Sequence, residues 1–180
     1  ILLLGPPEPL KTTPGTYQEN HPDFIYSSGW TQSINSAALG GGRRYTNQPG
    51  ASVSFEINST VGRVVIYRTT YAAGVYGSMQ VFLETSSTTP IATIDNTSSA
   101  FLYGQPYVLT IASPGDHTVT IKNVGSTYSD IDQIVLLGPP EPLTTTPGTY
   151  QETDLNLTYN GVWTQSINSA ALGGGRRYTN

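Results

Sequence analysis

Acidic and histidine side chains could carry acid–base chemistry in this 180-residue chain, but they are few and poorly placed for it. Two carboxylates held about 5 to 10 Å apart can hydrolyse a glycosidic bond. Several acids instead fall in proline-rich stretches: Glu8, Glu19, Glu141 and Glu152. The only histidines, His21 and His117, have no serine or cysteine nucleophile motif beside them. We therefore expect a protein that is not an enzyme and that needs no cofactor.

The stretch DIDQIVLLG contains two carboxylates, Asp130 and Asp132. They are two positions apart, so on a strand both would lie on the same face. Carboxylate oxygens in that arrangement could serve as Ca²⁺ ligands. The same side chains could instead accept hydrogen bonds from the backbone of neighbouring turns. We favour the second interpretation and keep a Ca²⁺ site at these two residues as the alternative.

Aromatic side chains offer binding chemistry, because a ring presents an apolar face, with a polar tip in tyrosine, to a sugar. The stretch RTTYAAGVYG places Tyr71 and Tyr76 in a loop between two expected strands, where binding residues concentrate. With Arg68 they are our carbohydrate-binding candidates. Other aromatic residues that could stack on sugar are expected to be packed for the most part: Trp30, Tyr45, Tyr67, Tyr103 and Tyr107.

Three N-x-S/T sequons, at Asn58, Asn96 and Asn156, are candidates for N-glycosylation. None has proline in its middle position. Threonines beside proline in the stretches 12–13 and 144–146 are similar candidates for O-linked sugar.

The composition indicates an extracellular protein of the cell surface. Only 11% of the residues are charged, against about a quarter in average proteins, and cysteine is absent. A net charge of −4 with scattered basic residues argues against a nucleic-acid partner. No apolar run reaches the roughly 20 residues of a membrane-spanning helix. With no initiator Met and no signal peptide, we expect a mature product or a fragment of a longer chain.

The chain repeats itself with a period of 133 residues, the offset between Trp30 and Trp163. Residues 1–47 return as 134–180 without insertion or deletion, and the differences cluster at 20–29. A period this long matches a whole domain rather than a solenoid repeat of about 20 to 50 residues. The repeating unit is therefore predicted to be a domain.

The proline-rich stretch GPPEPLKTTPG and its second copy GPPEPLTTTPG mark the domain boundaries. Proline favours an extended, semi-rigid backbone. We expect the organisation to be as follows: 1–4 the last strand of a preceding repeat, 5–15 a linker, 16–137 a complete domain, 138–148 a second linker, and 149–180 the start of the next repeat.

The complete domain is expected to be all-β. ASVSFEIN, residues 51–58, alternates apolar and polar side chains with the period of a half-buried strand. Further β-rich runs follow at 62–69, 77–84, 90–95, 105–111, 117–124 and 130–138. Short strands separated by turns, with no helical segment between them, predict an antiparallel β-sandwich or jelly roll. SINSAALGGG is expected to be a loop because three glycines end it.

Several of these motifs together resemble the galactose-binding-like β-sandwich modules that are repeated in large extracellular bacterial surface proteins. They are the W-T-x-S strand, GGRRYTN, GASVSFEI, GVYGSMQVFLE, PGDHTVTI and DIDQIVLLG, within residues 26–137. The resemblance implies a secreted jelly-roll module, often in tandem and often near carbohydrate. The loops ETSSTTP and NSTVGR depart from the usual pattern, so a ligand site there is not carried over.

Two functions fit these observations. The uniform repeat favours a structural unit of an extracellular filament or surface fibre, with β-sandwich domains joined head to tail by stiff linkers and contacting copies of themselves. A strand of one unit could also complete the sheet of its neighbour. The alternative is a carbohydrate-binding or adhesion module in a tandem array, with polysaccharide as its partner.

Overall fold

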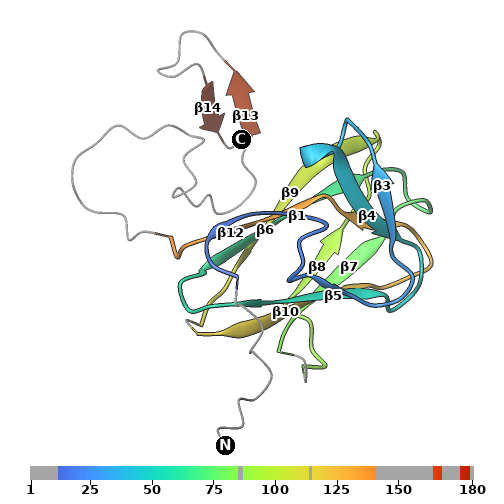
Figure 1. Cartoon of the computed structure of the whole chain (residues 1–180). Coiled ribbons are helices and arrows are strands. Elements are labelled where there is room, and N and C mark those ends of the chain that lie inside the picture. The colour runs from blue at the N-terminus through green and yellow to red at the C-terminus, as the bar shows by residue number, and fades with distance from the viewer. Residues whose placement is uncertain (1–11, 85–86, 114, 141–163, 168–174, 179–180) are drawn as a thin grey trace, which may run out of the picture. The chain divides into compact units, whose positions relative to one another are not determined.

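The computed structural model describes residues 12–84, 87–113, 115–140, 164–167 and 175–178. The chain divides into two compact units, Ile1–Pro139 and Pro140–Asn180. The boundary falls within the stretch 138–148 that was predicted as a linker. The described residues contain strands, turns and one short 3-10 helix, and no helix among them could cross a membrane (Figure 1). The all-β prediction is confirmed.

The first unit contains two larger antiparallel sheets and a smaller one. The four-stranded sheet has the order β1 (Gly15–Gln18), β12 (Gln133–Leu137), β6 (Arg63–Thr70) and β9 (Leu102–Thr110). The five-stranded sheet has the order β2 (Ile25–Tyr26), β5 (Ser52–Ile57), β10 (His117–Asn123), β7 (Ser78–Leu83) and β8 (Ala92–Asp95). The three-stranded sheet has the order β11 (Ser129–Ile131), β4 (Gly42–Thr46) and β3 (Thr31–Ile34).

The two larger sheets enclose one core, as a sandwich requires. On β5 the alternation predicted from ASVSFEIN is confirmed, because Val53, Phe55 and Ile57 are at most 1% exposed while the residues between them are half-buried. Further core side chains come from both sheets: Val64, Ile66, Met79, Val81, Ile94, Val119, Ile121, Ile134 and Leu136.

The stretch DIDQIVLLG forms two strands rather than one. Its first part lies in β11, which pairs with β4, and its second part is β12, which pairs with β1 and β6. Asp132 is the residue between them, and its backbone N–H donates to Tyr67 O at 2.9 Å. The chain therefore changes sheets at Asp132, so Asp130 and Asp132 belong to different local surroundings.

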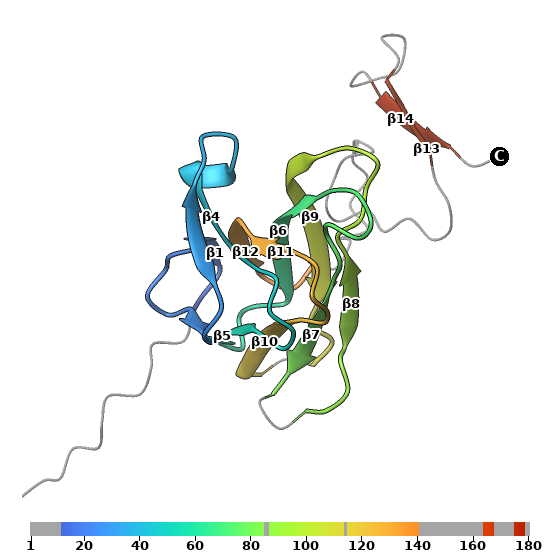
Figure 2. The same ribbon diagram turned by 90° about the vertical axis from the view of Figure 1, so that its right-hand side faces the viewer.

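The connections of the first unit gather at two ends of the sandwich (Figure 2). The loop end comprises segments 35–41, 71–77, 96–101 and 124–128: Asn35 Nδ2 donates to the Tyr103 hydroxyl at 2.7 Å, and isolated bridges join Tyr71 to Thr97 and Tyr76 to Tyr128. The linker end comprises segments 12–14, 58–62, 111–113, 115–116 and 138–140. There Thr12 bridges Ile57, and Gly15 pairs with Leu136.

The second unit repeats a hairpin of the first. Its strands are β13 (Thr164–Ile167) and β14 (Gly175–Tyr178), with Thr164 opposite Tyr178. In the first unit Thr31 is opposite Tyr45, so the register is identical at the offset of 133 residues. The duplicated sequence therefore forms the same local pairing in both places.

Candidate functional site

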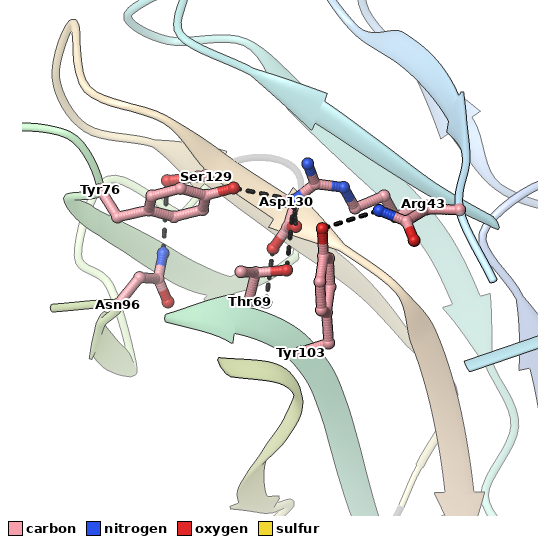
Figure 3. Close-up of polar contacts among 8 residues, drawn as sticks. Arg43, Thr69, Tyr76, Asn96, Tyr103, Ser129 and Asp130 are labelled. Carbon is pink, nitrogen blue, oxygen red and sulfur yellow. Dashed lines mark hydrogen bonds and ion pairs between the residues drawn. The ribbon is translucent and has the colours of Figure 1, made fainter. Parts of the chain in front are cut away.

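A buried ion pair lies at the loop end. Arg43, on β4, donates from Nη1 to Asp130 Oδ2 at 2.6 Å and to the Tyr76 hydroxyl at 2.8 Å. The other oxygen of Asp130 accepts the backbone N–H of Thr69 at 2.6 Å (Figure 3). Asp130 is fully buried. These bonds occupy both of its oxygens, which supports the expectation that Asp130 bonds neighbouring protein groups.

The surroundings of Arg43 and Tyr76 keep these two groups in defined protonation states. Burial lowers the pKa of Arg43, but hydrogen bonds to Tyr76 and Asp130 outweigh it and raise this pKa above its ordinary value. Burial and the negative charge of Asp130 raise the pKa of the Tyr76 hydroxyl. Arg43 therefore stays charged and Tyr76 stays neutral at physiological pH.

A second network, centred on Arg68, ties strands and loops together. Arg68 is 8% exposed, and its Nε donates to Asn96 Oδ1 at 2.8 Å. Its Nη1 and Nη2 donate to the carbonyls of Gln105 and Asp95. Asn96 Nδ2 in turn donates to Ser129 Oγ at 3.3 Å. Arg68 thus directs its guanidinium into the protein. A direct contact between Arg68 and sugar remains a prediction that these bonds disfavour.

Six aromatic rings form a contiguous group at the loop end, here named the loop-end aromatic cluster: Tyr45, Tyr71, Tyr76, Phe101, Tyr103 and Tyr128. Phe101 lies between Tyr71 and Tyr103, with ring centroids 5.1 and 4.8 Å away. The Arg43 guanidinium lies over two rings of the cluster, 5.6 Å from the centroid of Tyr45 and 5.3 Å from that of Tyr103. The Arg43 side chain of the ion pair therefore packs against the rings of the cluster.

Exposure divides the cluster into a buried part and an open part. Tyr76 is 5% exposed, whereas Phe101 is 41% and Tyr128 is 38% exposed. Tyr71 is half-buried. Of the two tyrosines predicted from RTTYAAGVYG, Tyr71 belongs to the accessible part and Tyr76 anchors it. Phe101 and Tyr128 were missed, although each is a lone aromatic at the end of a polar turn run, TSSAF and GSTY.

Two residues near the junction of β11 and β12, Asp132 and Gln18, carry buried polar oxygens; Gln18 is opposite Gln133, the residue after Asp132. Asp132 is fully buried, and neither of its carboxylate oxygens has a hydrogen-bond partner of normal geometry. Gln18 Oε1 is also buried without a partner. Burial raises the pKa of Asp132 to about 6, an effect that the backbone N–H of Leu39 and the charge of Arg43 only partly offset. These orphaned oxygens have the donor chemistry that suits a hard cation.

Two glycines let the β3–β4 connection and the start of β4 pass close to the side chains of Gln18 and Glu19. A Cβ at Gly40, where φ is +70°, would lie 2.1 Å from Gln18 Oε1, and a Cβ at Gly42 would lie 2.3 Å from Glu19 Oε1. Within the described ranges no three His, Cys, Asp or Glu side chains are grouped to hold a metal. A cation at Asp132 would therefore depend on amide or backbone oxygens as well as carboxylates.

No known family model matches this chain, and no curated protein matches it. Solved structures do match. A family 35 carbohydrate-binding module from Clostridium thermocellum aligns with a TM-score of 0.53 and 15% identity, over 71% of this chain and 99% of that module. The module CBM35 from Paenibacillus barcinonensis aligns with a TM-score of 0.52 and 13% identity, over 69% of this chain and 98% of that one. The fold is that of a jelly roll.

An enzyme is also similar in part. The exo-beta-1,3-galactanase of Phanerochaete chrysosporium aligns with a TM-score of 0.49 and 19% identity over 69% of this chain. The matched region is only 29% of that enzyme. At such identities the two carbohydrate-binding modules establish the fold alone, and the antiparallel β-sandwich or jelly roll predicted from the sequence is confirmed.

The glycosylation candidates lie in different surroundings. Asn58 is half-buried in a turn, where its Oδ1 accepts the backbone N–H of Thr60 at 3.0 Å. Asn96 is fully buried and its amide nitrogen donates to Ser129, so a glycan there would displace an internal bond. Asn156 lies outside the described residues.

A hollow of about 150 Å³ at the linker end contains a pH-sensitive pair. His117 Nδ1 lies 2.6 Å from Glu84 Oε1, and His117 Nε2 lies 2.8 Å from Ser113 O. Two acceptors favour an imidazolium that donates from both nitrogens. The Glu84 carboxylate, followed by the Ser113 carbonyl, raises the pKa of His117.

We expect this pair to make the first unit slightly less stable at alkaline pH. Its contribution is complete below the ordinary imidazole pKa and is lost as pH rises through the raised pKa of the folded state. The pair is partly exposed, so the loss is below about 1 kcal/mol. Thermal unfolding at pH 6 and pH 8.5 measures it, and His117→Gln should reduce the difference; Asp132, whose pKa is raised to about 6, contributes the remainder with the same sign. An unchanged difference in this variant would contradict the assignment.

Proposed function

We propose that this chain is a non-catalytic module that binds carbohydrate at the loop-end aromatic cluster. The observation that carries the proposal is the pair of exposed rings, Phe101 and Tyr128, joined through buried Tyr76 to the Arg43–Asp130 ion pair. Solvent-exposed aromatic rings are costly to leave in water and suit the apolar face of a sugar ring. Carbohydrate-binding modules of similar fold lend support by analogy of architecture.

The rings of the loop-end aromatic cluster are held in place before any ligand binds. They come from segments of the chain distant in sequence, and the Arg43 and Arg68 networks bond those segments together inside the protein. A site that is already ordered loses less conformational entropy when ligand binds. We infer that the open rings form a platform for sugar rings, with tyrosine hydroxyls as polar partners.

The carboxylates of these networks favour binding over hydrolysis. Asp130 is paired with Arg43, and Asp95 accepts hydrogen bonds from the backbone and hydroxyl of Thr97 at 2.9 and 3.0 Å. A glycosidase needs one carboxyl group as acid and a second as base or nucleophile. Neither of these two is free for such a role.

A cation site at Asp132 belongs to the same proposal. Asp130 is engaged with Arg43, so of the two residues predicted as Ca²⁺ ligands Asp132 is the better candidate, with Gln18 Oε1 as a second oxygen. A bound Ca²⁺ would neutralise the buried carboxylate and hold the end of β1 against the β3–β4 connection. Its role would be structural.

The sequence repeat supports a second role. Residues 1–47 return at 134–180, and the β3–β4 hairpin returns as β13–β14 in the same register. Such uniformity suits an extracellular array or filament of these domains, and a carbohydrate-binding array would gain avidity from the same repetition. Head-to-tail contact between units and a location at the cell surface remain predictions.

Binding to a panel of immobilised polysaccharides tests the main proposal. We expect Phe101→Ala and Tyr71→Ala each to weaken binding at least about tenfold, equivalent to about 1.4 kcal/mol. Val108→Ala is the matched control, because Val108 is 53% exposed on β9 but is not part of the cluster. Circular dichroism checks that each variant is folded. Failure to bind any polysaccharide, or equal binding by all variants, would leave the structural role as the better account.

A further inference from the structure

Both proline-rich linkers join the first unit at the same end. β1, the first strand after the incoming linker, pairs with β12, the last strand before the outgoing one, and Gly15 is opposite Leu136. Neighbouring strands are about 4.8 Å apart. The chain therefore enters and leaves the sandwich side by side.

Contacts at the linker end hold in place the two points where the linkers join the first unit. Before β1, the Thr12 backbone N–H donates to Glu56 O at 3.0 Å and the Asn58 N–H donates to Thr12 O at 3.3 Å. After β12, Pro139 packs so closely on Gly62 that a Cβ there would lie 2.3 Å from Pro139 Cα. The attachment of each linker is thus part of the folded unit.

The loop-end aromatic cluster lies at the opposite end of the strands. β6 runs from Arg63, which pairs with Leu137, to Thr70, which is followed by Tyr71. Its eight residues span about 26 Å. The rings are therefore separated from both linkers by the length of the sandwich.

We propose that successive repeats present their aromatic clusters away from a proline-rich spine, and that the partner is a polysaccharide surface offering many copies of one sugar site. This inference rests on the proposed carbohydrate function. Ten residues, 138–147, separate Leu137 from Gly148, the residue that matches Gly15, and a polyproline helix of ten residues is about 31 Å long. A short tether that joins the linker ends of neighbouring units lets their aromatic clusters contact one surface together. The head-to-tail order expected from the sequence would not allow this.

The test compares a one-unit protein, residues 12–139, with a two-unit protein. In the two-unit protein Asn180, which matches Asn47, is followed by another copy of residues 48–139, so that the second domain is complete. The one-unit protein contains every residue of the described core, so it should fold alone. The two-unit protein should bind the immobilised polysaccharide on the order of 100-fold more tightly. A short soluble oligosaccharide should bind each site of the two proteins equally. Equal affinity of the two proteins for the immobilised polymer would overturn the proposal.

A distance measurement separates failure of this inference from failure of the sugar function. The chain has no cysteine, so spin labels at Ala112→Cys (linker end) or Ser99→Cys (loop end) attach at chosen exposed positions. We expect linker-end labels on neighbouring units to be closer together than a loop-end label on one unit and a linker-end label on the next. The reverse order would indicate head-to-tail packing and contradict the inference whether or not sugar binds. If neither protein binds polysaccharide while the label distances hold, the sugar function fails, and with it the partner proposed here.

Discussion

Replacing Asp130 with alanine should lower the free energy of unfolding of the first unit by about 3 to 5 kcal/mol. The variant leaves the Arg43 guanidinium, whose side chain is only 13% exposed, without its buried counter-charge. It also removes the acceptor of the Thr69 backbone N–H. Chemical denaturation of the wild type and the variant measures the difference.

A surface pair supplies the control for this prediction. Asp23 lies 3.7 Å from His21 Nδ1, and both side chains are about 30% exposed. Asp23→Ala should therefore cost at most about 1 kcal/mol. A similarly small loss for Asp130→Ala would mean that the buried network contributes little to stability. In that case our inference that the Arg43–Asp130 ion pair stabilises the aromatic cluster would be wrong.

Calcium should raise the melting temperature of the wild-type chain at pH 7, and Asp132→Asn should abolish the effect. A ligand at about 100 times its dissociation constant stabilises a folded protein by about 2.7 kcal/mol. Without Ca²⁺, the variant should be at least as stable as the wild type, because the substitution removes a buried charge whose oxygens have no hydrogen-bond partner of normal geometry. Differential scanning calorimetry with and without Ca²⁺ measures both effects.

Two comparisons make the calcium result specific. Asp23→Asn removes an exposed carboxylate elsewhere and should leave the response to Ca²⁺ unchanged. Gly40→Ala should weaken the response, since its Cβ would meet Gln18 Oε1, the second oxygen of the proposed site. A wild-type melting temperature that does not respond to Ca²⁺ would show that Asp132 is only a buried, partly protonated carboxyl group.

Features that depend on nearby residues could be predicted from the sequence. The alternation in β5 follows from the period of a strand, and its three inward side chains are those that the pattern indicated. The stretch SINSAALGGG, predicted as a loop, is a connection only over 35–41, where it contains a short 3-10 turn; its first two residues belong to β3 and Gly42 begins β4. The hairpin at 164–178 repeats the pairing of its first copy, as a locally determined structure should.

The candidate site depends on residues that the sequence keeps apart. Asp130 and Asp132 look equivalent by spacing, but the chain changes sheets between them, so one pairs with Arg43 and the other has unsatisfied oxygens. Arg68 and Tyr76 looked like loop contacts for a ligand, yet both are buried. No local pattern reveals which long side chains turn inward.

Most of the strands, the repeat and a set of aromatic residues with faces suited to sugar could be predicted from the sequence alone. Which of those residues meet, and which face solvent, depends on the tertiary structure. Arg43 and Asp130 are 87 positions apart, and Tyr71 and Phe101 come from different loops. Strand periodicity acts over neighbouring residues, whereas these contacts exist only after the sheets have paired and brought their loops to one end.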